Sequence, residues 1–483
     1  MTTGNRAEGR FNDTKPASRI EVSIMKNDMT TGKEWKLILF FTLPIMAGSF
    51  LQQLYNTVDG IIVGQFVSEA AFSGVATCSA LTQLFLALAM GLSIGVGIVI
   101  SQYYGAGKHD RLPVAVETAL MLLGAIGLIL TAVGIGIAPF MLGTVLGVPG
   151  HILPYSVTYF RVYVLGLFFQ FVYNGIAATL RGLGDSKAIL FFLLISTVLN
   201  VLLDLLFVAV FNFGVSGAAY ATVISQVVCV LVSYRYIRKR FPYSKGSKHW
   251  DREVSATMAK LGLPIAIQQG VVSFGHGAMQ RLVNSFSAQM PGNIAAYGAA
   301  GRLNSFITVP IMGFQSGLAS FTGQNIGAGR LDRVYRGFRR TLAMSMTVTL
   351  VMCFFMNFNA ERVVSAFGVS GNALALGAEQ IRFMTWCYWM FCCYQTMGGL
   401  LQGSGDTAFQ SITTLSALGS SIVAAYALVY FNVLGYSAAW TGTPFGWSLA
   451  IIISYTRFFT GGWRKKAVAG SLARGAPQND VGE

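Results

Sequence analysis

Acidic and amide side chains interrupt several long apolar segments of this sequence, and the clearest cases are Asp59 and Asp204. A carboxylate near the middle of a membrane-spanning helix costs about 2.5–3.5 kcal/mol to insert, so it needs either a partner or a function. Asp59 follows Gln52 and Asn56 at helical spacing, which places the three side chains on one stripe. We predict that this stripe faces protein or water and not lipid.

Three further segments each carry two polar residues four positions apart, on one helical face. These pairs are Asn200 with Asp204, Gln170 with Asn174, and Thr222 with Gln226. If the helices converge, their carboxylate, amide and hydroxyl oxygens are the hard ligands that suit sodium, and two adjacent carboxyls could instead share a proton. For Asn174 and Thr222 a purely structural role, joining helices by hydrogen bonds, is an equal alternative.

A longer polar stripe is predicted on the segment that begins near Thr257. Its members follow one another at steps of three or four residues: Gln269, Ser273, His276, Gln280 and Asn284. Such a stripe is typical of a helix that lines a water-filled cavity, and we assign Gln395 to the same cavity. His276 is either a group that titrates near neutral pH or a hydrogen-bonding partner.

The elements that carry these residues are predicted to be transmembrane helices. The 483-residue chain is 54% hydrophobic and 11% charged, whereas soluble domains carry about 25% charged residues. Thr118–Phe160 and Thr407–Thr456 contain no Lys, Arg, Asp or Glu, and each is long enough for two crossings. Divided at Gly, Pro and charge clusters, the apolar stretches predict about twelve helices. They begin near Trp35, Phe72, Pro113, Ile152, Lys187, Val215, Thr257, Asn293, Arg339, Asn372, Thr407 and Gly435.

The net charge of +15 follows membrane topology and does not require a nucleic-acid partner. If both termini are cytoplasmic, 29 of the 34 Lys and Arg residues lie in the tails and the cytoplasmic segments, and five of the six opposite loops have none. The positive-inside rule therefore predicts a multi-pass protein of the plasma (inner) membrane with both termini in the cytoplasm. The basic segment from Arg235 to Lys260 is expected to contact anionic lipid as well.

The two halves of the chain repeat each other. LPI at 43–45 recurs at 263–265, GAGKHDR at 105–111 recurs as GAGRLDR at 327–333, and LRGLGD at 180–185 recurs as LQGSGD at 401–406. A six-helix unit returns the chain to its starting side, so the two copies are related by an axis along the membrane normal. We predict an all-α membrane protein with a disordered cytoplasmic tail (1–33), an N-lobe (34–240), a basic linker (241–256), a C-lobe (257–463) and a second cytoplasmic tail (464–483).

The repeat also shows that the acidic pair belongs to the N-lobe alone. Asp59 corresponds to Met279, and Asp204 corresponds to Ala425. Two repeated lobes with intramembrane acids in only one of them favour a rocking transporter whose ion site lies in that lobe. No metal-ligand cluster, nucleophile elbow or phosphate-binding loop is present to indicate an enzyme or a cofactor.

Several motifs together resemble those of the multidrug and toxic compound extrusion (MATE) family. They are QQLYNTVDGIIVG at 52–64, LRGLGD at 180–185, NVLLD at 200–204 and the GAGK/GAGR turns, and the resemblance extends over residues 33–463. It implies that Asp59, Asn200, Asp204 and Thr222, with Asn174 nearby, bind a coupling sodium ion or proton. Some MATE branches place a Glu on the seventh helix, but residues 271–273 here are Val, Val and Ser.

The expected function is secondary active export of organic cations or amphipathic drugs by a monomer, driven by inward sodium or proton flow. One alternative is a lipid-linked oligosaccharide flippase of the same superfamily, whose anionic cargo would require several Arg or Lys in the cavity. The candidate lining of Gln52, Asn56, Gln170 and their neighbours is instead acidic and amide-rich. A non-transporting scaffold or receptor is the alternative from another class.

Overall fold

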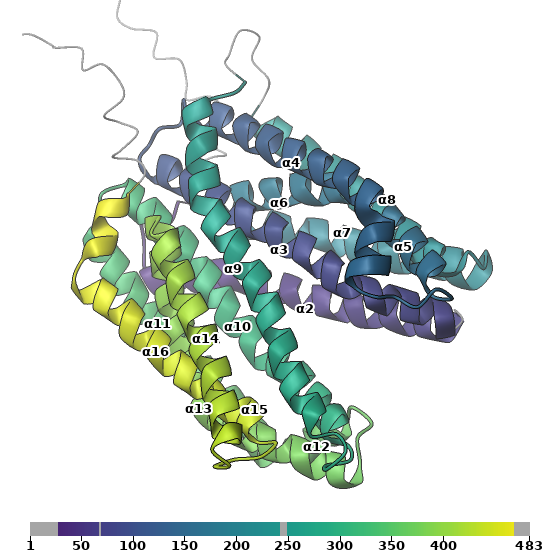
Figure 1. Ribbon diagram of the computed structural model, residues 1–483. Coiled ribbons are helices and arrows are strands. Elements are labelled where there is room, and N and C mark those ends of the chain that lie inside the picture. Colours follow the sequence, from purple (N-terminus) through teal and green to yellow (C-terminus); the bar gives the residue numbers. More distant parts are fainter. Residues whose placement is uncertain (1–27, 67–68, 242–248, 468–483) are drawn as a thin grey trace, which may run out of the picture.

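The computed structural model describes residues 28–66, 69–241 and 249–467, and these residues are nearly all helical (Figure 1). In the first half of the chain the helices are α2 (Glu34–Phe66), α3 (Glu69–Gly105), α4 (Leu112–Phe140), the π-helix η1 (Met141–Val145), α5 (Leu153–Leu165), α6 (Leu167–Gly182), α7 (Ser186–Asp204), the π-helix η2 (Leu205–Val210) and α8 (Gly214–Arg240). In the second half they are α9 (Arg252–Ser285), α10 (Asn293–Gly327), α11 (Leu331–Phe358), α12 (Ala360–Ser365), α13 (Gly371–Ser404), α14 (Thr407–Tyr430), α15 (Ala438–Thr441), α16 (Thr443–Phe459) and the 3₁₀ turn η3 (Gly462–Lys466).

The described chain provides twelve membrane crossings, as predicted. Seven helices are long and apolar enough to span a membrane, or eight when the bent pair α5–α6 counts as one span. The helices α9, α10 and α13 have 34, 35 and 34 residues, and at about 1.5 Å per residue each exceeds the hydrocarbon core. Their many polar side chains lower the mean hydropathy, so a hydropathy criterion does not select these helices. The broken pair α15–α16 completes the set.

Two helix starts were predicted too late. The α11 helix begins at Leu331 and not near Arg339, and α9 begins at Arg252 and not near Thr257. The charge clusters at these places were interpreted as helix boundaries. Arg, Lys and Glu are good helix formers, so both helices continue past the apolar region that hydropathy detects.

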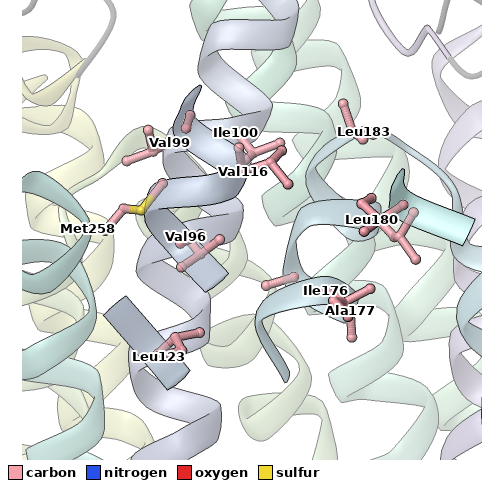
Figure 2. Packing of buried hydrophobic residues seen from close by; sticks show 14 of the residues in the cluster. Val96, Val99, Ile100, Val116, Leu123, Ile176, Ala177, Leu180, Leu183 and Met258 are labelled. Atoms are coloured by element: carbon pink, nitrogen blue, oxygen red, sulfur yellow. The ribbon is translucent and has the colours of Figure 1, made fainter. Parts of the chain in front are cut away.

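The lobes are formed by α2–α8 and by α9–α16, and they meet closely at one end and separate toward the other (Figure 1). We call the end where the lobes meet the basic end; it contains the turns 106–111, 183–185, 328–330 and 405–406. We call the opposite end the open end; it contains the turns 146–152, 211–213, 286–292 and 431–437. A cluster of small and branched side chains on α3, α4 and α6 forms the N-lobe core, and Met258 of α9 joins it across the lobe boundary (Figure 2).

Two reciprocal hydrogen bonds join the lobes at the basic end. Gln102 of α3 donates from Nε2 to the Gly403 carbonyl of the C-lobe at 3.0 Å, and Gln324 of α10 donates from Nε2 to the Gly182 carbonyl of the N-lobe at 2.9 Å. The donors occupy equivalent positions in the two repeats, as do the acceptors. Both glutamines are fully buried. We call this pair of bonds the basic-end seal.

Glycine is required beside the seal because the backbones touch. A Cβ at Gly105 would overlap the Gln324 carbonyl oxygen, and a Cβ at Gly327 would overlap the Gln102 carbonyl oxygen. The GAG repeats found in the sequence therefore allow α3 and α10 to cross at backbone contact.

Candidate functional site

A cavity of about 870 Å³ lies between the lobes. Its walls come from α2, α3, α6 and α7 of the N-lobe and from α9, α10, α13, α14, α15 and α16 of the C-lobe. A volume of this size accommodates a drug-sized molecule. The cavity is therefore the candidate substrate site.

Five of the residues that we predicted to line a cavity do line this one: Gln52, Gln170, Gln269, His276 and Gln395. Asn174, which was predicted to lie near the ion site, also belongs to this wall, and its Nδ2 donates to the Gln170 carbonyl of its own helix at 2.8 Å. The structure thus places Asn174 at the interlobe cavity and not in the cluster around Asp204. The side chain of Asn56 lies outside the described residues.

Three members of the predicted stripe on α9, Ser273, Gln280 and Asn284, are not among the described residues that line this cavity. Their bonds stay within α9: Ser273 Oγ donates to the Gln269 carbonyl at 3.0 Å, and Gln280 Nε2 donates to Asn284 Oδ1 at 2.9 Å. At about 100° per residue, Ser273 lies just past the edge of the lining face, and Gln280 and Asn284 lie beyond Met279, the last lining residue of α9, toward the open end. The face that lines the cavity is centred on Ile265, Gln269, Val272 and His276.

Gln395 belongs to a network of C-lobe amides and hydroxyls whose other members were not predicted from the sequence. Gln395 Nε2 donates to Gln315 Oε1 at 3.2 Å, Gln410 Nε2 donates to Thr414 Oγ1 at 3.2 Å, and the Thr414 and Tyr394 hydroxyls lie 2.6 Å apart. All five residues line the cavity. The available signal was the occurrence of Gln315 and Gln410 within apolar segments, and Gln410 with Thr414 forms an i, i+4 polar pair like those of the N-lobe.

Aromatic rings cover the C-lobe wall. The ring centroids of Tyr388 and Phe391 lie 5.6 Å and 5.1 Å from that of Trp447, and Trp440 lines the cavity near them. Aromatic faces bind planar apolar groups and attract cations through their quadrupole. This wall suits an aromatic amphipath.

The described wall contains no Asp or Glu, so the expected acidic lining is not found there. Its polar groups are mainly amides and hydroxyls, and its permanently charged side chain is Arg181. Asp204 lies behind the wall at the junction of α7, η2 and α8, where it is fully buried. The sequence showed that Asp204 lies inside the membrane region, but only the packing of the helices decides which side chains reach the cavity.

The N-lobe cluster joins Asn200 and Asp204, which share a face of α7 as their spacing predicts, with Thr222 of α8. With its amide oriented so that both atoms have partners, Asn200 donates from Nδ2 to Asp204 Oδ2 at 2.8 Å and accepts from the Thr222 backbone N–H at 3.2 Å. The Thr222 hydroxyl lies 3.4 Å from the hydroxyl of Tyr55 on α2. Asn200 is 1% exposed and Asp204 is 0% exposed.

A smaller cavity of about 90 Å³ adjoins this cluster and is lined by Tyr55, Asn200 and Thr222 among others. Gln52, Gln170 and Tyr173 line both cavities, so they form the partition between them. Asp204 ends the α-helical part of α7, and the π-helix η2 follows directly. Such π-helical turns often mark functional sites, because they shift side chains out of regular register.

The Asp59 side chain lies outside the described residues. Its neighbours on α2 locate this turn of the helix: Tyr55 contacts Thr222 of α8, and Ile62 packs with Val208 of η2. The turn that carries residue 59 therefore belongs to the same junction as Asp204. A buried carboxylate with amide and hydroxyl oxygens beside a small cavity can exchange a proton or coordinate a small hard cation.

The repeated turns at Asp185 and Asp406 hold helices together and are not part of the described cavity wall. Asp185 caps α7 at the Ala188 N–H (3.3 Å) and accepts from Arg240 Nη1 at 2.8 Å. At the equivalent place in the C-lobe, Asp406 accepts from Arg457 Nε at 2.8 Å. Both ion pairs tie neighbouring helices at the basic end, consistent with the structural role expected of such turns.

Comparison with known proteins identifies the family. The chain is 27% identical over 447 residues to the probable multidrug resistance protein YoeA of Bacillus subtilis (strain 168), covering 90% of this chain and 95% of that protein. The probable multidrug resistance protein YpnP of the same strain is 29% identical over 436 residues, covering 89% and 94%. A structure described as the outward-facing conformation of a multidrug resistance MATE family transporter of the MOP superfamily has a TM-score of 0.84 at 24% identity, covering 90% and 98%. The MatE family profile matches residues 44–206 and 264–427, one segment in each lobe. With both repeats matched, the resemblance seen in the motifs is confirmed: the chain belongs to the MATE family of efflux transporters.

Proposed function

We propose that this protein is an antiporter that exports organic cations and other amphipathic drugs, driven by inward flow of sodium ions or protons through the N-lobe cluster. The observation that carries the proposal is the pair of adjacent cavities. The larger one is drug-sized and aromatic, and the smaller one adjoins the buried Asn200–Asp204–Thr222 cluster. The relatives named above are themselves called multidrug resistance proteins, which agrees with a drug cargo.

Coupling between the sites follows from their shared partition. Gln52, Gln170 and Tyr173 face both cavities, so ion occupancy at the small site can alter the wall of the large one. We propose that Asp59 and Asp204 act as one pair that holds a single proton or sodium ion, because two close carboxylates cannot both remain ionised cheaply. Ion and drug then favour different conformations of α2, which has Pro44 in its interior.

The orientation of the transporter is part of the proposal. The basic end is assigned to the cytoplasm by the positive-inside rule. The lobes are joined at that end and separate toward the other, so this conformation is open to the outside (Figure 1). Export then requires a second conformation in which the basic-end seal opens. A lipid-linked oligosaccharide flippase is less well supported, because the described wall offers Arg181 and no cluster of Arg and Lys for a pyrophosphate.

The test is ethidium efflux from proteoliposomes under an imposed sodium gradient, proton gradient or neither. We expect efflux under one of the two gradients, and we expect Asp204→Asn to abolish it without loss of the purified, monodisperse protein. Asp185→Asn is the matched control, because it removes a carboxylate charge from a helix clasp outside the cavity wall. Efflux that is equally fast without any gradient, or unchanged in Asp204→Asn, would contradict coupled antiport through this site.

A further inference from the structure

Arg181 places a positive charge in the interlobe cavity. It lies in the last turn of α6, is half-buried, and lines the cavity. Within the described residues no carboxylate forms an ion pair with its guanidinium, and no Asp or Glu lines the wall. A half-buried charge with no counter-ion among the described residues is costly and is a candidate functional group.

The fold does not require this charge. The repeat places Gln402 at the equivalent position of α13, where it also lines the cavity and is 8% exposed. A neutral amide thus meets the packing demands of the same turn in the other lobe. An Arg near a helix C-terminus gains from the helix dipole, but this gain is modest and would apply equally to the end of α13.

A second unpartnered polar group lies near Arg181. The hydroxyl of Tyr173, about two turns earlier on α6, is buried without a hydrogen-bond partner within the described residues. Helical side chains lean toward the N-terminus of their helix, so Arg181 extends from the basic end back toward the level of Tyr173. Guanidinium N–H groups and a phenolic O–H are the donors that bind a carboxylate.

We propose that Arg181 and Tyr173 form a subsite for the carboxylate of an amphipathic substrate, at the floor of the cavity next to the seal. The inference rests on the proposed drug-export function and refines it: aromatic zwitterions that carry one carboxylate are bound more tightly than their esters. Arg181 takes the acid, and the ring system of the substrate lies in the cavity beyond it. A carboxylate so bound supplies a counter-ion that the described residues do not provide.

The experiment compares rhodamine 110, which has a free carboxylate, with its methyl ester rhodamine 123, by equilibrium fluorescence binding to the purified full-length protein. We expect the wild type to bind rhodamine 110 more tightly. Arg181→Gln, which copies Gln402, should weaken rhodamine 110 binding about 10- to 100-fold and leave rhodamine 123 within about twofold. Tyr173→Phe should weaken rhodamine 110 alone, by about three- to tenfold.

Two further variants make the result specific. Arg181→Lys keeps the charge and should retain part of the preference for the acid. Arg161→Gln removes the same charge from the exposed Arg161, which bonds the Ile135 carbonyl outside the cavity wall, and should change neither affinity. An equal loss of both dyes in Arg181→Gln, or unchanged rhodamine 110 binding, overturns the subsite. Absence of gradient-driven rhodamine 123 efflux by the wild type would overturn the proposed function instead.

Discussion

Replacing Gln324 by Met should open the basic-end seal, because Met has nearly the same shape and no amide. Two backbone groups lose their partner in this variant: the Gly182 carbonyl, which accepts from Nε2 at 2.9 Å, and the Met29 N–H, which donates to Oε1 at 2.9 Å. A buried polar group left without its hydrogen bond costs about 1–3 kcal/mol. Only the bond to Gly182 belongs to the seal, so the conformation described here loses about 1–3 kcal/mol relative to one in which the seal is already broken. Even about 2 kcal/mol changes the ratio of the two conformations about 30-fold.

The ratio of the two conformations can be measured from the distribution of distances across the open end. Val145 at the end of η1 and Phe431 at the end of α14 are exposed on opposite lobes, and spin labels there report separation by pulsed electron paramagnetic resonance. We expect Gln324→Met to add or enlarge a population with a shorter distance, in a background from which the six cysteines have been removed. Gln102→Met should shift the ratio in the same direction, because it breaks the equivalent bond to Gly403.

Gln395→Met provides the matched control. It also removes a glutamine amide from the cavity region, but the bond that it breaks, to Gln315, lies within the C-lobe. It should leave the distance distribution unchanged. If Gln324→Met and Gln102→Met give the wild-type distribution under conditions that populate both conformations, the seal does not set the conformational equilibrium and the reasoning fails.

Three further predictions concern coupling and topology. Asp59→Asn should abolish gradient-driven efflux while membrane insertion is retained, since removing a charge from hydrocarbon eases insertion. If the Asp59→Asn variant transports at the wild-type rate, Asp59 has only a structural role. In wild-type protein, drug affinity should fall as the sodium concentration rises or as the pH falls. The reason is linkage: the ion and the drug change each other's affinity by the same factor. A drug affinity that stays constant in both titrations would refute exchange at one coupled site. A cysteine introduced at Ser247 should resist an impermeant reagent added to intact cells, whereas strong labelling would reverse the assigned topology.

The sequence alone determined the class of the protein, its repeat and its family. Helical membrane spans follow from composition because every backbone polar group must be satisfied in lipid, and the repeat follows from three matched motifs. The shared helical face of Asn200 and Asp204 was also predictable, whereas their meeting with Thr222 depended on how the helices converge. Residues four apart share a helical face, and a carboxylate in an apolar segment must turn toward other polar groups.

Only the tertiary structure decided which side chains reach each cavity, because this depends on the rotation and bend of each helix. The bend of 41° between α5 and α6 at Gly166, where a Cβ would lie 2.9 Å from Gln226 Oε1, is not visible in hydropathy. Helix rotation excluded Ser273 from the wall and placed Asn174 on it. The exposure of Arg181 to the cavity and the reciprocal bonds of Gln102 and Gln324 likewise depend on how two lobes dock, and that docking joins residues hundreds of positions apart in the chain.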